Sequence, residues 1–371
     1  MKRWMDGAII AVVGWLVFSG TSHAQDPIVI GLSVPMTGQY GETGKSIHTG
    51  VELAVKQINE AGGIQGRPLE IIIGDSQGAP DISKRVARKF ISNPKIVAEI
   101  GDFTSGCSMA AQPIYDKAGM VQLSPTSSHP SFAPGSPFSF GIVGTRESAF
   151  MARAAVERMG KKRIAIAYLE TDWGVAAKEY FIKEATQLGA EIVATESYLD
   201  GTTDFSATLK SLRAAQPDMI FLASMLPDAV GIAKQRQLDG WDDVLLAGVS
   251  ALYTPEFLKL GGDAVENLLA IALFFPKDPR PEVQNFIATY QSAYQIPPSW
   301  FAAVGYDAMN VLADAIKQGG VDRKAIQQAL ASIKEFSGVT GKIVFSEHGD
   351  VAREYALLQV KQGEFVLFEG K

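Results

Sequence analysis

The sequence has a single cysteine, Cys107, among its 371 residues. An intramolecular disulfide is therefore impossible, so the fold must rest on buried apolar surface even in an oxidising compartment. No cysteine stands directly after the apolar N-terminal stretch, so a lipid-modified N-terminal cysteine is not expected. Cys107 has no evident base beside it, and we interpret it as a small buried residue.

Histidine is also scarce, with four in the chain, and none shows paired metal-ligand spacing. A G-x-S-x-G nucleophile motif does not occur. The segment 38–46 resembles a phosphate-binding loop, but five residues separate its glycines where that motif needs four. Asp102, His129 and Ser128 lie on neighbouring loops and would form a hydrolytic triad only by coincidence. We expect a protein that is not an enzyme and that uses no metal or cofactor.

Blocks of basic residues are missing too. Lysine and arginine total 34 against 40 acidic residues, which gives a formal net charge of −6. An acidic chain without basic clusters is a poor partner for nucleic acid or for an anionic membrane surface. We expect neither as a partner.

An apolar run does occur at the N-terminus, over residues 7–20. It follows Lys2 and Arg3 and precedes Ser22-His23-Ala24, which places small residues where a signal peptidase reads the chain. The run is too short for a spanning helix, which needs about 20 residues, and no later stretch is apolar enough. We expect a signal peptide over residues 1–24, cleavage after Ala24 and a periplasmic protein.

The remaining residues, 25–371, are too many for one ordinary core. They read as a repeating series of strand, loop and helix, and the series restarts near residue 163. Expected strands cover 28–34, 69–73, 96–100, 121–123, 163–169, 191–198, 219–223 and 244–247. Expected helices include 45–61, 108–118, 175–188, 205–215, 228–238, 281–294, 301–318 and 323–334, and a hairpin over 355–360 and 364–368 turns at Gln362-Gly363. The fold class is therefore α/β, with two doubly wound, Rossmann-like lobes.

Open α/β sheets bind ligands beyond the carboxyl ends of their strands, which directs attention to the loops there. In the first series, these loops hold Ser105, Thr126, Ser127 and Ser128 near expected helix starts. Hydroxyls beside free N–H groups can cradle a carboxylate or an amide, but serine and threonine at such positions can equally be helix caps. In the second series, Trp173, Met225 and Tyr253 either wall an apolar ligand or pack within a lobe.

Short motifs in a fixed order carry a resemblance to a known family. They are Pro35-Met36-Thr37-Gly38, Gly44, Gly50, Ile58-Asn59, residues 62–67, Asp75 with Pro80, Gly101 with Ser105, Ser124-Pro125, Asp204-Phe205 and Gly305-Tyr306. Over nearly the whole chain after residue 24, the sequence resembles the Leu/Ile/Val-binding proteins, which are periplasmic solute-binding proteins of ABC importers.

The resemblance implies a type I periplasmic-binding-protein fold, the Venus flytrap, with three hinge crossings near 139–145, 270–274 and 341–345. The first lobe would then comprise residues 25–140 plus 274–342, and the second 141–273 plus 343–371. It also implies a monomer that delivers a small organic solute to an inner-membrane ABC permease. The alternatives are a periplasmic sensor of the same fold and a binder of amides or urea.

The resemblance further implies site residues. Ser105 and Ser128 would grip a ligand carboxylate, and the Thr126 carbonyl, in the same loop as Ser127, would accept from an ammonium or another donor. Trp173 falls where relatives place an aromatic ring over the ligand. Thr43, Met225 and Ser250 fall at other contacting positions.

Two departures from the family pattern stand out. Gly78 and Thr104 occupy the positions where some relatives carry a disulfide, and Ser250 occupies the position where amino-acid binders often place an acid. Burying an ammonium without a counter-charge is expensive. Either Asp102 or Asp172 supplies the charge, or the ligand is an aromatic acid, an aliphatic acid or an amide instead of an α-amino acid.

Overall fold

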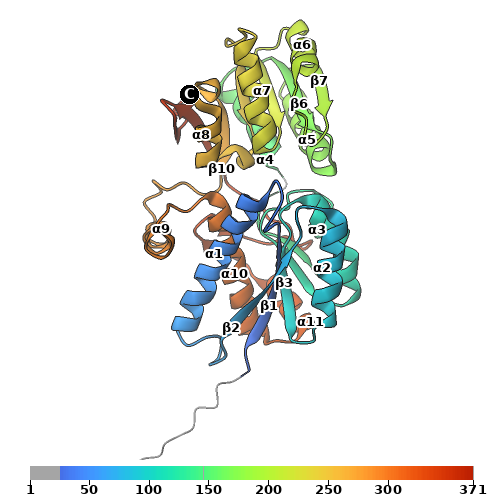
Figure 1. Ribbon diagram of the computed structural model, residues 1–371, viewed down its shortest axis with the longest axis vertical. Helices are drawn as coiled ribbons and strands as arrows, with labels where there is room; N and C mark the ends of the chain where they lie inside the picture. The colour runs from blue at the N-terminus through green and yellow to red at the C-terminus, as the bar shows by residue number, and fades with distance from the viewer. Residues whose placement is uncertain (1–25, 145, 371) are drawn as a thin grey trace, which may run out of the picture.

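The computed structural model describes residues 26–144 and 146–370, which form two lobes (Figure 1). The expected signal peptide lies outside this part of the chain. Within it, no helix is both long enough and apolar enough to cross a membrane.

The first lobe is built on a sheet with the order β2-β1-β3-β4-β5, in which every pair of neighbours is parallel. Its inner strand β1 is buried along its whole length because helices cover both faces of the sheet. The strands are β1 (Ile28–Val34), β2 (Leu69–Asp75), β3 (Ile96–Gly101), β4 (Val121–Ser124) and β5 (Ser139–Gly141). One face packs against α1 (Gly41–Glu60), α10 (Trp300–Gly319) and α11 (Arg323–Ser332), and the other against α2 (Pro80–Ser92) and α3 (Ser105–Lys117). Helix α9 (Pro281–Tyr294) packs on the outer side of α1.

Helices α1 and α10 touch almost backbone to backbone. A Cβ added at Gly50 would lie 1.9 Å from the Ala302 carbonyl oxygen, and one added at Gly305 would lie 2.4 Å from the Ile47 carbonyl oxygen. Only glycine allows this approach. Gly50 and Gly305, both part of the family pattern, therefore allow α1, early in the chain, to pack closely against α10, late in the chain.

The second lobe has the strand order β14-β13-β10-β9-β8-β6-β7. Strands β6 to β10 are parallel to their neighbours, and β13 and β14 add an antiparallel edge. Its strands are β6 (Arg163–Leu169), β7 (Glu191–Tyr198), β8 (Met219–Ala223), β9 (Leu245–Gly248), β10 (Leu269–Ala272), β13 (Ala356–Lys361) and β14 (Glu364–Leu367). Its helices are α4 (Glu147–Arg153), α5 (Asp172–Gln187), α6 (Ser206–Ala214), α7 (Leu226–Leu238) and α8 (Pro255–Gly261). The two-lobed α/β class expected from the sequence is confirmed.

The chain passes between the lobes at three places that overlap the expected crossings. It leaves the first sheet after β5 and packs α4 against α5 of the second lobe. It returns between β10 and α9, and it crosses again between the small hairpin strand β12 (Gly341–Ile343), which pairs with β11 (Phe336–Gly338), and β13.

Several element bounds differ from the expectation by a few residues, and two of the differences have clear local reasons. Helix α3 begins at Ser105, three residues earlier than expected, because the Thr104 side chain caps it by accepting from the Cys107 N–H at 3.3 Å. Helix α4 was not expected at all. Five of its seven residues are buried, including Glu147 and Ser148, so it shows no alternation of apolar and polar faces.

Candidate functional site

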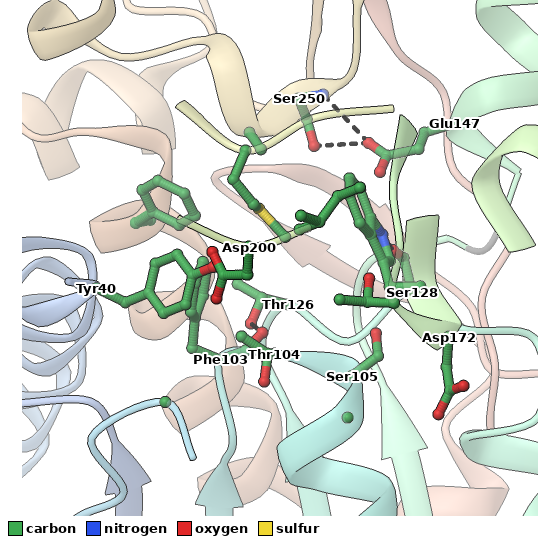
Figure 2. Close-up of a pocket in the computed structure, with 18 of the residues that line it drawn as sticks. Tyr40, Phe103, Thr104, Ser105, Thr126, Ser128, Glu147, Asp172, Asp200 and Ser250 are labelled. Carbon is green, nitrogen blue, oxygen red and sulfur yellow. Dashed lines mark hydrogen bonds between the residues drawn. The ribbon is translucent and has the colours of Figure 1, made fainter. Parts of the chain in front are cut away.

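The carboxyl ends of the two sheets face each other across a cleft between the lobes (Figure 2). It encloses a cavity of about 220 Å³. The loops that follow β3, β4, β6, β8 and β9 all contribute to its lining, as the rule for open α/β sheets requires. The site is therefore shared between both lobes.

The first lobe supplies a polar floor at the start of a helix. Ser105 is the first residue of α3, where free N–H groups and the positive end of the helix dipole favour an anion. Thr126 and Ser128 follow β4 and also line the cleft. The Thr126 hydroxyl donates to the Phe103 carbonyl at 2.7 Å, which ties the two loops together. This floor can offer several donors to a carboxylate.

Asp102 supports this floor from beneath and does not line the cleft. Its carboxylate accepts hydrogen bonds from Ser33, Ser76 and Ser83 at 3.1, 2.9 and 2.7 Å. Burial raises the pKa of Asp102 to about 6, and the bonds from the serines oppose that rise. The expectation that Asp102 faces a ligand is therefore corrected: it is a structural acid, 1 % exposed, whose oxygens are turned toward its own lobe.

Two other expected residues also lie outside the cleft lining. The Ser127 hydroxyl is 2.6 Å from the Ser108 hydroxyl in the interior beneath the loop. Thr43 lines a smaller adjoining pocket instead of the main cavity. Tyr253, considered as a possible wall, packs edge-on against Phe365 with ring centroids 4.9 Å apart.

Aromatic rings and a methionine form the walls. Phe103 packs against Tyr40 and Phe301, with ring centroids 5.2 and 5.7 Å apart. From the second lobe, Met225 and the largely buried Trp173 face the same space. The body of a ligand held here would contact mostly carbon.

The Trp173 indole also joins the lobes. Its Nε1–H donates to the Ser128 hydroxyl oxygen at 2.9 Å, although Trp173 belongs to α5 and Ser128 to the loop after β4. A second link runs from the Gln39 amide to Asp200, at 2.9 and 3.1 Å from the two carboxylate oxygens. These hydrogen bonds join the two lobes across the cleft.

The second lobe contributes a buried acid that the sequence reasoning missed. Glu147 is the first residue of α4, lines the cleft and is 8 % exposed. Its Oε2 accepts from the Ser250 hydroxyl at 2.6 Å and from the Ser250 N–H at 3.3 Å (Figure 2). Burial raises the pKa of Glu147, and the two bonds from Ser250 oppose the rise. The sequence feature that could have identified Glu147 is an acidic residue shortly after the first expected crossing between the lobes.

The imagined hydrolytic triad does not assemble. His129 Nδ1 accepts from the Ser131 N–H at 3.1 Å, while the Asp102 carboxylate is held by serines of its own lobe. No hydrogen bond joins His129 to Asp102 or Ser128 in the part of the chain that the structure describes. Likewise, no group of acids, histidines and cysteine suited to a metal ion occurs among those residues.

Comparison with known proteins defines the class. The model of the periplasmic binding protein family matches residues 27–364. The Leu/Ile/Val-binding protein homolog 1 of Brucella melitensis is 27% identical, covering 94% of this chain and 93% of that one. The leucine-, isoleucine-, valine-, threonine- and alanine-binding protein of Pseudomonas aeruginosa is also 27% identical, covering 93% and 91%.

Solved structures agree with this result. The leucine-binding protein LivK of Thermotoga maritima superposes with a TM-score of 0.86 at 28% identity, covering 92% of this chain and 97% of that chain. LivJ of Streptococcus pneumoniae, solved with isoleucine, gives 0.85 at 25% identity, covering 91% and 97%. The chain belongs to the periplasmic binding protein family, and the resemblance drawn from its motifs is confirmed.

Proposed function

We propose that this protein captures a small organic acid with an apolar body, either an amino acid or a related carboxylate, and delivers it to an inner-membrane ABC permease. The hydroxyls of Ser105 and Ser128 would hold the carboxylate, Thr126 would contribute its carbonyl, and Trp173, Met225 and Ser250 would contact the rest of the ligand. The names of the relatives, which bind leucine, isoleucine and similar amino acids, support this assignment.

The observation that carries the proposal is the composition of the cleft. A floor of hydroxyls at the start of α3 faces a wall of carbon from both lobes. A carboxylate needs several donors, and hydroxyls with helix N–H groups supply them without a fixed cation. A ligand that touches both lobes stabilises their closed arrangement, which is the form that a permease can distinguish from an empty, open protein.

The test is a thermal-shift screen over amino acids, aliphatic acids, aromatic acids and amides, followed by calorimetry on the best ligand. A ligand at 100 times its Kd adds about 2.7 kcal/mol to the free energy of unfolding. Ser105→Ala should weaken binding about 5- to 150-fold, because one donor to a buried carboxylate is lost. The matched control is Ser131→Ala, an exposed serine outside the cleft lining, which should bind like the parent. Equal binding by all three proteins would contradict the proposal.

Export completes the proposed function. We expect cleavage after Ala24, because a short apolar run with basic residues before it and small residues after it is typical of a signal peptide. Intact-mass measurement on protein from the periplasmic fraction should show a chain that begins at Gln25. Full-length protein recovered with the membranes would contradict this expectation.

A further inference from the structure

We propose that the first lobe contains a buried proton-binding site, formed by Glu99, Tyr115 and Gln122, in which Glu99 is a neutral carboxylic acid. Through Gln122, this site holds the start of α3, and with it the polar floor of the cleft, in place. The three residues lie inside the lobe and do not line the cleft. Only the importance of the floor for a ligand rests on the proposed function, since the proton site itself can be tested without a ligand.

Glu99 lies within β3 and faces α2 and α3. Its neighbours Ala98 and Ile100 belong to the core on the opposite face of the sheet, so the Glu99 side chain points to the side that α2 and α3 cover. In the parallel register of β3 with β4, Glu99 lies directly beside Gln122. Residues paired in this way point to the same face of a sheet, so the two side chains are neighbours. Both are fully enclosed, at 0 % and 1 % exposed.

Four buried oxygen atoms here have no hydrogen-bond partner among the described residues: the two carboxyl oxygens of Glu99, the Gln122 Oε1 and the Tyr115 hydroxyl. Burial, and after it the nearby carboxyls of Glu99 and Asp102, raise the pKa of the Tyr115 hydroxyl well above its usual value, so it keeps its proton. With Glu99 ionised, the Tyr115 O–H would be the one donor for three acceptor oxygens. With Glu99 protonated, its own O–H can donate to the Gln122 Oε1 while the Tyr115 O–H donates to the other Glu99 oxygen.

The proton belongs to Glu99 and not to the neighbouring Asp102, because the two carboxyls have different donors. Asp102 accepts from three serine hydroxyls at 3.1, 2.9 and 2.7 Å and from the Phe103 N–H at 2.6 Å. These bonds stabilise its ionised form, whereas Glu99 has no such donor among the described residues and an unpaired buried charge is very costly. Burial, and after it the charge of Asp102, raise the pKa of Glu99 well above its usual value.

The elements packed around Glu99 bring no positive charge to it. The buried side chains of α2 are uncharged, and β1 places Gly31 beside Glu99 in register. The buried side chains of α3 include two titratable groups, Tyr115 and Cys107, and burial raises the pKa of the Cys107 thiol to about 11. Over the described residues, no lysine, arginine or histidine acts on the pKa of Glu99. Burial therefore favours the neutral acid without opposition.

Gln122 connects the proton site to the floor of the cleft. Its amide N–H donates to the Ser108 carbonyl at 3.1 Å, and Ser108 lies near the start of α3. The Ser108 hydroxyl accepts from the Asp102 N–H at 2.9 Å and lies 2.6 Å from the Ser127 hydroxyl, so it joins the loops after β3 and β4. A proton on Glu99 fixes the Gln122 amide at its oxygen, while Ser108 fixes it at its nitrogen. Glu99 is thus a positioning residue for the start of α3.

The first experiment compares urea titrations of the parent and Glu99→Gln over a range of pH. The folded parent keeps a proton that the unfolded chain releases near pH 4, so Glu99 lowers the folding equilibrium constant by up to about tenfold for each pH unit above that value, until the folded pKa is reached. Glutamine mimics the neutral acid and has no proton to release. Glu99→Gln should therefore become steadily more stable than the parent from about pH 5 to 8. The control is Glu70→Gln, which neutralises an exposed acid on β2 and should follow the parent.

The second experiment measures hydrogen exchange at the start of α3, over the backbone amides of residues 107–111, in Glu99→Gln and Glu99→Met. Glutamine can donate to the Gln122 Oε1 and methionine cannot, although both fill the space and both lack a charge. Glu99→Met should lose about 2- to 12-fold of the protection at these amides, which is the worth of one neutral hydrogen bond, and Glu99→Gln should keep it. The amides of residues 229–233, in α7 of the second lobe, are the internal control and should exchange alike in both variants.

Each part of the inference can fail separately. Parallel pH curves for the parent and Glu99→Gln overturn the proton site, because the folded parent would then hold Glu99 ionised. Equal protection of the α3 amides in Glu99→Met and Glu99→Gln, or a loss that extends equally to α7, overturns the positioning role. Should Glu99→Gln fail to fold, Glu99→Met replaces it in the urea titrations, because it too has no proton to release. None of these results depends on a ligand, so the proposed function stands or fails by its own ligand screen.

Discussion

The hydrogen bond from Trp173 to Ser128 should control how easily the lobes close. It joins α5 of the second lobe to the loop after β4 of the first lobe at 2.9 Å, so it can form only when the lobes are together. Trp173→Phe removes the N–H donor and keeps an aromatic ring against the cleft. The parent indole is 8 % exposed, so the bond is largely shielded from water.

The expected size follows from the worth of one hydrogen bond. A neutral bond contributes about 0.5–1.5 kcal/mol net, which corresponds to about a 2- to 12-fold change in an equilibrium constant. The apparent dissociation constant rises by the factor by which the closed, binding-competent fraction falls. Trp173→Phe should therefore weaken binding of the best screened ligand by about 2- to 12-fold, with some further loss from the smaller ring.

A double-mutant cycle with Ser128→Ala isolates the bond from these other effects. Calorimetry should show that Trp173→Phe costs less affinity in the Ser128→Ala protein than in the parent, because the acceptor is already gone. The matched control is Trp241→Phe, which changes a buried tryptophan of the second lobe outside the cleft and should leave affinity unchanged. Equal losses in both backgrounds would refute the reasoning, since the bond would then contribute nothing to closure.

Three further outcomes are expected. Burial is the main reason why the pKa of the Cys107 thiol is raised to about 11. Cys107 should therefore not react with Ellman's reagent at pH 8 until denaturant unfolds the protein. Rapid reaction of the native protein would contradict its burial. Gly50→Ala should lower the free energy of unfolding by about 1–3 kcal/mol, because its Cβ would meet the Ala302 carbonyl oxygen at 1.9 Å. The control is Gly106→Ala, whose Cβ would meet nothing within 4 Å and which should not lower the free energy of unfolding. Thermal melts compare the two variants. Burial and the nearby charge of another aspartate raise the pKa of Asp228 to about 7, so the folded protein keeps a proton that the unfolded chain releases near pH 4. The free energy of unfolding should therefore fall as pH rises from about 4 to 7, and urea titrations of Asp228→Asn should show a shallower fall than the parent.

The sequence by itself determined the alternation of strands and helices and the order of the lobes. Buried parallel strands such as 28–34 are continuous apolar runs, and amphipathic helices such as 281–294 repeat apolar residues at helical spacing, so both leave a local signal. The rule for the carboxyl ends of strands then pointed to the loops that hold Ser105, Ser128 and Trp173, and these residues do line the cleft.

Only the tertiary structure decided which acid faces the cleft. Asp102 and Glu147 are both single acids beside predicted site segments, and nothing local distinguishes them. Three serines from separate segments of the first lobe enclose the Asp102 carboxylate, whereas a lobe crossing and the contact with Ser250 place Glu147 at the cavity. Which way a carboxylate turns depends on partners far away in the chain, and such partners are set by packing and leave no pattern at short range.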